Sequence, residues 1–358
     1  MCGAESRRAP VQPGDSADLT ESMQRREFLY GSMAAAALRA MPAAAVAATP
    51  TRRILYVYGQ VPQPEAAVDA AVQSLGNSGF NVLILSFLRV HLERGKLDLR
   101  YNDTPFSALN ATLAPIVRRL QRGFPQRKRI LLSLGGWAQL GAFEAIRTYG
   151  VEEFVAVLNR EVIAPLGIDG LDIDLEPMTG GLPEWVAVHH EYGKTIADLT
   201  NVYKQTNPTH VVTHAPVSGI AAQLYATPAL LPGLPEGLLA ATRTAQGNNI
   251  DWLNVQFYEG GAVTGMTIPE FYRSQLAGPL VAAQAKSGVR RPLHFLTPLL
   301  EPNAAQPLDF CRRTIAAIDD DCRSLHAGNV DGVALWEYGQ IASAINQWSS
   351  GLQAALRG

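Results

Sequence analysis

The chain has few cysteines, little charge and no long uninterrupted apolar run. Its 358 residues include 3 cysteines, charged residues make up 17%, and the formal net charge is −2. So few cysteines exclude a disulfide framework. A nearly neutral chain also has no basic field that would attract nucleic acid or an anionic membrane surface. Hydrophobic residues, in contrast, make up 47%, which predicts a large folded core and argues against disorder.

The two cysteines near the C-terminus, Cys311 and Cys322, leave one disulfide open. In a continuous helix their α-carbons would lie about 16 Å apart, which is too far to bridge. A disulfide therefore requires that the acidic run at 319–321 breaks the helix.

The first 48 residues are typical of an export signal. Arg25 and Arg26 lie in a segment that resembles the twin-arginine motif, and an alanine-rich run follows from Gly31 to Ala48. Ala45-Val46-Ala47 offers a small-residue cleavage site. We expect residues 1–48 to be removed on export to the periplasm or the medium. The alternative is a disordered or amphipathic N-terminal extension.

Residues 49–358 alternate short apolar runs with longer stretches of helical character, and we expect them to form one catalytic domain. Eight alternations over about 300 residues fit a (β/α)8 TIM barrel better than an open doubly wound sheet. The interval from Glu301 to Asn329 has room for a helix but not for a large insertion domain. The expected strands are Ile54–Tyr58, Asn81–Phe87, Arg129–Leu134, Gly170–Glu176, His210–Ala215, Trp252–Tyr258, Pro292–Thr297 and Gly332–Trp336.

The fourth of these strands carries the most informative pattern. Side chains alternate along a strand, so Asp172, Asp174 and Glu176 share one face while the intervening residues share the apolar one. Three inward carboxyl groups are costly unless they serve a purpose. The alternatives are an exposed edge strand or a metal site, although no His or Cys lies nearby to complete a coordination shell. Stacked carboxyls raise the pKa of one another, which keeps one protonated near neutral pH.

This stretch resembles glycoside hydrolase family 18, the chitinases and their relatives. The family pattern D-G-x-D-x-D-x-E is complete here, and it runs from Asp169 through Gly170 to Glu176. The resemblance implies that Glu176 is the general acid, Asp174 holds the substrate's acetamido group, and Asp172 tunes Asp174. Asp169 supports the motif.

Three other segments extend the resemblance. Ser133, Gly135 and Gly136 match the S-x-G-G signature, which implies a serine that supports the first acid of the motif and glycines that make room near the sugar. These three residues are therefore assigned to the substrate side of the site. The tryptophan of the last strand, Trp336, is expected to form the floor under the sugar at the cleavage point.

The sixth strand ends in the Q-F-Y segment of plant-type and some bacterial chitinases. Gln256 is placed with the substrate-binding residues, and the hydroxyl of Tyr258 is expected to touch the acetamido group. The family follows this segment with Asn or Asp, whereas Glu259 stands here, and its effect on the cleft rim stays open.

The resemblance implies hydrolysis in which the substrate's own acetamido oxygen acts as nucleophile, a known exception to the two-carboxylate scheme. We expect an exported, monomeric endochitinase that needs no cofactor or metal, has no membrane anchor and binds chitin or N-acetylglucosamine oligosaccharides. The alternatives are an endo-β-N-acetylglucosaminidase on N-glycans and a non-catalytic sugar-binding protein of the same fold.

Overall fold

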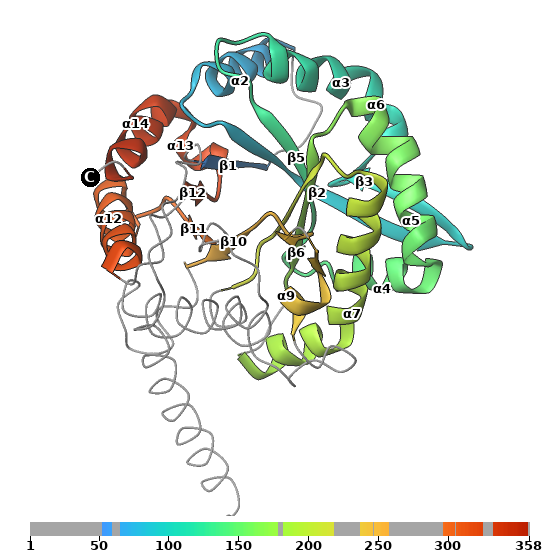
Figure 1. Ribbon diagram of the computed structural model, residues 1–358. Coiled ribbons are helices and arrows are strands. Elements are labelled where there is room, and N and C mark those ends of the chain that lie inside the picture. Colours follow the sequence, from blue (N-terminus) through green and yellow to red (C-terminus); the bar gives the residue numbers. More distant parts are fainter. Residues whose placement is uncertain are drawn as a thin grey trace, which may run out of the picture.

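The chain forms a closed barrel of eight parallel strands (Figure 1). The computed structural model describes residues 52–58, 65–177, 182–217, 237–245, 247–257, 296–304, 306–324 and 332–356. The barrel strands are β1 (Arg52–Tyr58), β2 (Val82–Glu93), β5 (Arg129–Gly136), β6 (Gly170–Leu175), β7 (Val211–His214), β10 (Trp252–Gln256), β11 (Leu296–Leu300) and β12 (Gly332–Leu335). Pairing of β1 with both β12 and β2 closes the ring. The expected TIM barrel is confirmed.

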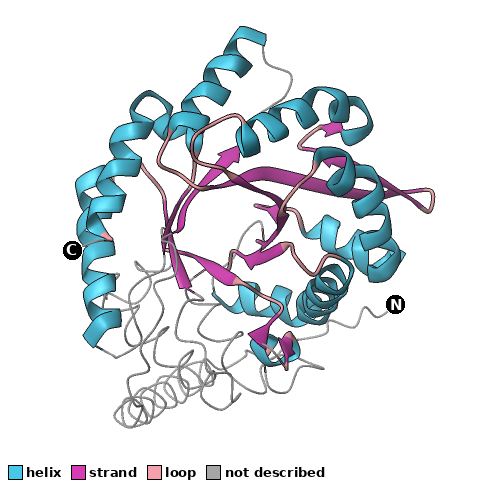
Figure 2. Cartoon of the chain, turned by 45° about the horizontal axis from the view of Figure 1, so that its top comes forward, coloured by secondary structure: helices cyan, strands magenta, loops and turns pink. Residues whose placement is uncertain are grey.

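Helices surround this ring on the outside (Figure 2). They are α2 (Glu65–Asn77), α3 (Phe106–Arg122), α4 (Leu140–Tyr149), α5 (Val151–Leu158), α6 (Ala164–Leu166), α7 (Leu182–Thr206), α9 (Leu238–Ala241), α12 (Leu308–Ser324), α13 (Tyr338–Ile341) and α14 (Ile345–Ala355). A π-helical turn (Asn159–Ile163) joins α5 to α6, and a 3-10 turn (Ala342–Ala344) precedes α14. A small ribbon of β8 (Arg243–Thr244) and β9 (Gly247–Asn248) stands apart from the barrel sheet.

Alternation along the strands divides the core in two. One set of apolar side chains fills the barrel interior and includes Ile54, Ile84, Leu131 and Leu299. The other, larger set lies between the strands and the surrounding helices. Leu171, Ile173 and Leu175 of β6 belong to this outer set, which leaves the acidic face of that strand toward the interior, as the pattern predicted.

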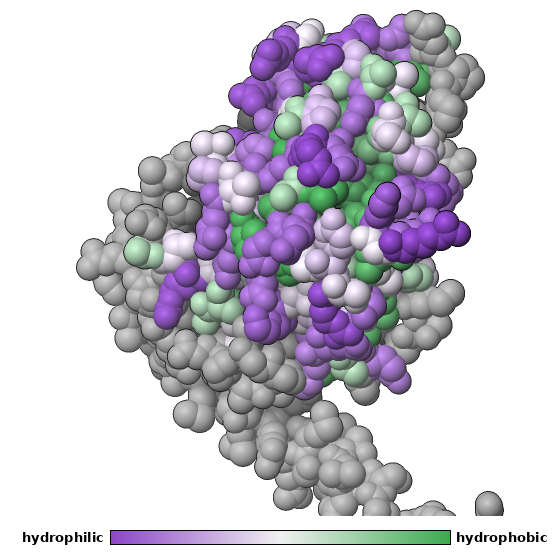
Figure 3. All heavy atoms as spheres, turned by 90° about the vertical axis from the view of Figure 1, so that its right-hand side faces the viewer, coloured by the Kyte–Doolittle hydropathy of each residue, from purple (hydrophilic) through white to green (hydrophobic). Residues whose placement is uncertain are grey.

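One face of the barrel is mostly polar. The side of the barrel seen in Figure 3 is dominated by hydrophilic residues, with apolar ones between them. None of the helices in the described ranges combines the length and the apolar character needed to cross a membrane.

Strand β2 is longer than predicted and carries a hairpin that the sequence analysis missed. Beyond the barrel, β2 pairs antiparallel with β3 (Lys96–Tyr101), which in turn pairs with β4 (Thr104–Pro105). Arg94 and Gly95 both have positive φ, at 50° and 74°. This geometry is that of a two-residue hairpin turn whose twist matches the flanking strands. We call the projecting part of β2 and β3, residues 88–101, the arm.

Strand β11 lies later in the chain than predicted. The expected bounds were Pro292–Thr297, and the strand is observed at Leu296–Leu300. Pro298 lies inside it and pairs with Val255 of β10. Proline lacks a ladder donor and therefore favours an earlier strand end, but its fixed φ suits extended backbone, so the strand continues.

Helix α12 contains both cysteines that the sequence left as a possible disulfide pair. Cys311 is free and buried, and the helix runs without a break through 319–321 to Ser324. Because the helix is continuous, Cys311 and Cys322 remain about 16 Å apart and cannot form a disulfide.

Gly170 is required by the close approach of β6 and β7. A Cβ at this position would lie 2.1 Å from the carbonyl oxygen of Val211, which is fixed backbone. We expect Gly170→Ala to lower the free energy of unfolding by about 3 kcal/mol, the upper end for overpacking. Urea denaturation measures this. Gly141→Ala is the matched control, because nothing lies within 4 Å of its Cβ. Equal stability of the two variants would contradict the argument.

Candidate active site

Three carboxyl groups form a column that rises along β6 toward the mouth of the barrel. The exposed fraction increases from 0% at Asp172 to 3% at Asp174 and 9% at Glu176. Solvent or a ligand therefore approaches from the Glu176 end, which is the C-terminal end of the strand. Active sites of such barrels lie at this face.

Asp172 lies inside the barrel and accepts four hydrogen bonds. Its Oδ2 accepts from Ser133 Oγ at 2.7 Å and from the Tyr56 hydroxyl at 3.1 Å. Its Oδ1 accepts from Thr213 Oγ1 at 2.5 Å and from Asn254 Nδ2 at 3.2 Å. The donors come from β1, β5, β7 and β10, so four other strands converge on one carboxyl group.

Burial and these hydrogen bonds act in opposite directions on Asp172. Burial raises the pKa of its carboxyl to about 6, and the four donors limit the rise because they stabilise the charged form. Asp172 is therefore largely ionised at neutral pH and takes up a proton under mildly acidic conditions.

Asp174 and Glu176 interact with each other and with Gln256. The side chains of Asp174 and Glu176 are hydrogen-bonded. Gln256 Nε2 lies 3.2 Å from Asp174 Oδ1 and 3.4 Å from Glu176 Oε1, and it donates to the Ala215 carbonyl at 2.9 Å. That carbonyl can only accept, so it turns the NH₂ group of Gln256 toward the two acids.

The pKa of Asp174 is raised well above its ordinary value. The largest cause is burial, followed by the negative charges of Glu176 and Asp172. Neighbouring carboxyls repel each other when both are ionised, so the pair favours a state in which one of them is protonated. A carboxyl that keeps its proton is what a general acid requires.

The two glycines of β5 allow close packing around the acids. A Cβ on Gly135 would lie 2.1 Å from the backbone oxygen of Asp174, and one on Gly136 would lie 2.6 Å from the ring of Phe87. Both have positive φ, at 104° and 83°. They were expected to make room near the sugar, and the atoms they make room for are those of Asp174 and Phe87.

Trp336 follows β12 and belongs to an aromatic cluster at the mouth of the barrel. Its ring stacks on Phe87 with centroids 5.4 Å apart and an interplanar angle of 27°. Tyr56 contacts it edge-on at 5.7 Å, and Tyr58 lies at 5.9 Å. Tyr58 is 44% exposed, so the cluster reaches solvent. An aromatic surface of this kind suits the apolar face of a sugar ring.

One assignment from the sequence changes in the structure, and the position of the expected motif support, Asp169, becomes clear. Ser133 is fully buried and bonds Asp172, which is the second acid of the motif rather than the first. Asp169 lies just before β6, at the opposite end from Glu176, and accepts from Gln121 Nε2 at 2.9 Å and Arg127 Nη2 at 2.9 Å. It ties the helix side of the barrel to the strand and does not reach the acidic column.

Tyr258 and Glu259 lie outside the described residues. Sequence reasoning did not assign Tyr56, Thr213 and Asn254 to the site, although all three donate to Asp172. Asn254 also donates to the Tyr56 hydroxyl at 3.1 Å. The available signal was the two-residue period of β1, β7 and β10, which puts these polar groups on the interior face.

No cluster of three or more potential metal ligands of the His, Cys, Asp and Glu types occurs in the described part of the chain.

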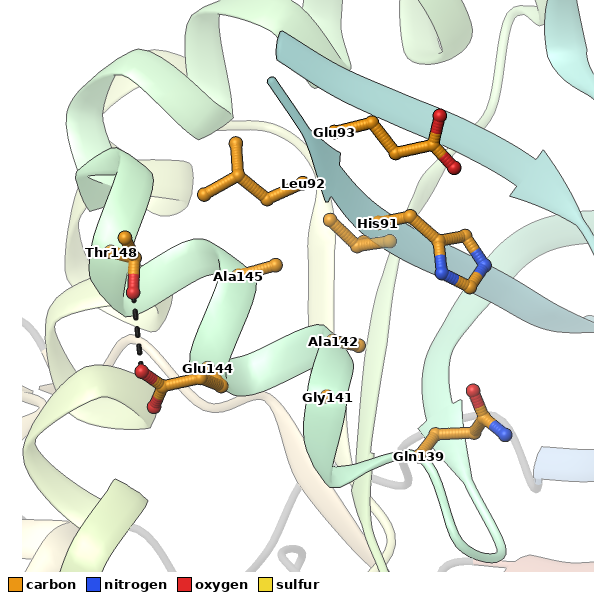
Figure 4. A pocket seen from close by; sticks show the side chains of 10 residues that line it. His91, Leu92, Glu93, Gln139, Gly141, Ala142, Glu144, Ala145 and Thr148 are labelled. Atoms are coloured by element: carbon orange, nitrogen blue, oxygen red, sulfur yellow. Dashed lines mark hydrogen bonds between the residues drawn. The ribbon is translucent and has the colours of Figure 1, made fainter. Parts of the chain in front are cut away.

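A groove separate from the acids lies between the arm and α4 (Figure 4). Its volume is about 350 Å³, and none of the three acids lines it. His91 and Glu93 of β2 face Gln139 and the start of α4 across it, and Thr148 donates to Glu144 on the helix side.

Comparison with solved structures finds the same barrel fold in chitinase domains and in an inhibitor protein. The Legionella pneumophila ChiA C-terminal domain matches with a TM-score of 0.54 and 18% identity over 85% of this chain and 98% of that one. The catalytic domain of a hyperthermophilic chitinase from Pyrococcus furiosus matches with a TM-score of 0.54 and 12% identity over 87% of this chain and 98% of that one. A xylanase and α-amylase inhibitor protein, XAIP-II from Scadoxus multiflorus, matches with a TM-score of 0.46 and 14% identity over 86% of this chain and 99% of that one.

No protein-family model matches the sequence, and no curated protein does so either. The structural similarity therefore establishes a barrel fold shared with the two chitinase domains.

The Thr213 hydroxyl gives a direct test of the Asp172 network. We expect Thr213→Val to raise the pKa of Asp172 further above about 6, because a donor that stabilises the ionised form is lost. A hydrogen bond to a charged group corresponds to about 1–2 pKa units. NMR titration of the Asp172 carboxyl carbon measures the change.

Thr200→Val is the matched control, since Thr200 is equally buried but bonds His214 and Ile196 instead. A pKa for Asp172 that is the same in both variants would show that Thr213 has no such effect.

Proposed function

We propose that the protein is an exported chitinase that hydrolyses β-1,4 bonds between N-acetylglucosamine units. The observation that carries this proposal is the acidic column of β6, in which Asp174 and Glu176 are hydrogen-bonded beside an aromatic cluster. A carboxyl that keeps its proton and an aromatic surface are what glycoside cleavage requires of a protein.

Glu176 has the best position for the general acid. It is the most exposed of the three carboxyls and lies at the end of the column that solvent reaches. In the proposed reaction it donates its proton to the glycosidic oxygen as the bond to the anomeric carbon breaks. It later takes a proton from the water that attacks the same carbon, so it leaves the cycle unchanged.

Asp174 is proposed to act on the acetamido group of the substrate. In the proposed reaction the acetamido oxygen attacks the anomeric carbon and forms a cyclic oxazolinium ion, which water then opens with net retention. Asp174 accepts the acetamido N–H and stabilises the positive charge. Asp172, held by its four donors, keeps a negative charge behind Asp174 at neutral pH. Tyr258 is proposed to steady the acetamido oxygen.

Glu176→Gln is expected to bind N-acetylglucosamine oligomers and to lose turnover by about 10²–10⁴-fold, the usual contribution of general acid catalysis. The amide keeps the shape of the side chain but has no proton to donate. The wild-type protein and the variant are each incubated with chitin oligomers and with an N-glycopeptide. The masses of the products measure turnover and identify the substrate class.

The exposed residue Glu191, which bonds Arg147 on the helix surface, gives the control variant Glu191→Gln. Cleavage of the glycopeptide alone by the wild-type protein would indicate an endo-β-N-acetylglucosaminidase. Binding of oligomers without any cleavage would indicate a sugar-binding protein.

A thiazoline analogue of the cyclic intermediate tests the source of the nucleophile. We expect it to inhibit strongly, because a site built for an intermediate binds its mimic far more tightly than the substrate. Asp174→Ala is expected to weaken that inhibition sharply, whereas Asp198→Ala on the surface of α7 leaves it unchanged. Cleavage of unacetylated oligomers at the rate of chitin oligomers, with no thiazoline inhibition, would overturn the mechanism.

A further inference from the structure

Arg89 brings a positive charge to the mouth of the barrel beside the aromatic cluster. It lies on β2 where the arm leaves the barrel, opposite Arg100 of β3. Its guanidinium carbon lies 5.4 Å from the centre of the Phe87 ring, and that ring stacks on Trp336. Arg89 Nη1 donates to the carbonyl of Gly135 at 3.3 Å, next to the acids. The charge is therefore at the edge of the proposed sugar site.

The surroundings of Arg89 compensate its charge only in part. The side chain is half-buried, and burial lowers the pKa of its guanidinium, while the charges of Tyr58 and Asp103 oppose that lowering. Among the described residues it makes no ion pair, and the Gly135 carbonyl is its single hydrogen-bond acceptor. A guanidinium has five N–H donors in a planar fork, so most of them remain available to a ligand.

Arg100 provides the contrast on the same arm. It forms an ion pair with Asp98 at 2.6 Å, and a hydrogen bond to that carboxylate raises the pKa of its guanidinium. Both arginines are on one arm and at one register position, but among the described residues only Arg100 forms an ion pair with a carboxylate. Arg89 thus lacks the kind of group that best matches a guanidinium, a carboxylate that accepts two parallel hydrogen bonds.

We propose that Arg89 selects an amino-sugar chain that carries a carboxylate on the sugar adjacent to the one cleaved. This inference rests on the proposed function, and it deepens it by naming the substrate class. Arg89 donates two parallel hydrogen bonds to that carboxylate at the edge of the site. The aromatic cluster contacts the sugar ring at the cleavage point. A neutral chitin chain satisfies the same site less well, because it offers the half-buried guanidinium no carboxylate to bind directly.

The test compares two oligomers that differ only in charge. One alternates N-acetylglucosamine with N-acetylglucosamine that carries a 3-O-lactyl ether, so both neighbours of an unmodified sugar bear a carboxylate. The other has each lactyl group as its methyl ester. We expect the wild-type protein to cleave the carboxylate form with a kcat/KM about 10- to 100-fold higher than the ester. The ratio of the two kcat/KM values should fall toward one in Arg89→Met. In Arg89→Lys it should lie between the wild-type value and one.

Arg100→Met is the matched control and should keep the wild-type ratio. The same two oligomers are also titrated by calorimetry against Glu176→Gln with and without Arg89→Met, so selection is measured even if no oligomer is cleaved. Absence of cleavage by the wild-type protein would then count against the proposed function and not against the selection. Equal affinity for acid and ester in the Glu176→Gln protein, or a preference that survives Arg89→Met, would overturn the proposal. If Arg89→Met does not fold, Arg89→Lys and Arg89→Gln give the ratio instead.

Discussion

The burial of Asp172 is the constraint on which the site depends. A carboxyl group in the interior of a closed barrel loses its hydration, and the protein replaces that hydration with hydroxyl and amide donors from four other strands. Those donors must reach one point, so they determine the register at which the strands meet: Ser133, Asp172 and Thr213 are direct neighbours across β5, β6 and β7. The polar network is thus part of the barrel architecture.

The same column produces a gradient of chemical properties over a few residues. Asp172, at the inner end, has its charge held by hydrogen bonds, whereas Asp174 is crowded by two other acids and has its pKa raised well above normal. Glu176, at the outer end, is reached by solvent. Groups of identical chemistry thereby obtain different protonation behaviour from position alone, which is a common way for one site to supply both an acid and a stabilising charge.

The mouth of the barrel combines this acidic column with aromatic rings and the guanidinium of Arg89. Gly136 lets the Phe87 ring approach β5, and Phe87 in turn supports Trp336 and lies beneath Arg89. The arm therefore joins the site through packing at its base, although its tip extends well beyond the barrel (Figure 1).

The sequence by itself determined the barrel class and the inward face of β6, because a two-residue period and an eightfold alternation are local patterns that survive folding unchanged. It also put Gln256 on the polar face of its strand, together with Asn254. It did not determine that Ser133 bonds Asp172 or that Tyr56 and Asn254 complete the network. Nor did it determine that, among the described residues, Arg100 forms an ion pair with a carboxylate and Arg89 does not. Those facts depend on which strands become neighbours and at what register. Contacts between residues 39 to 198 positions apart in the chain are decided only when the barrel closes.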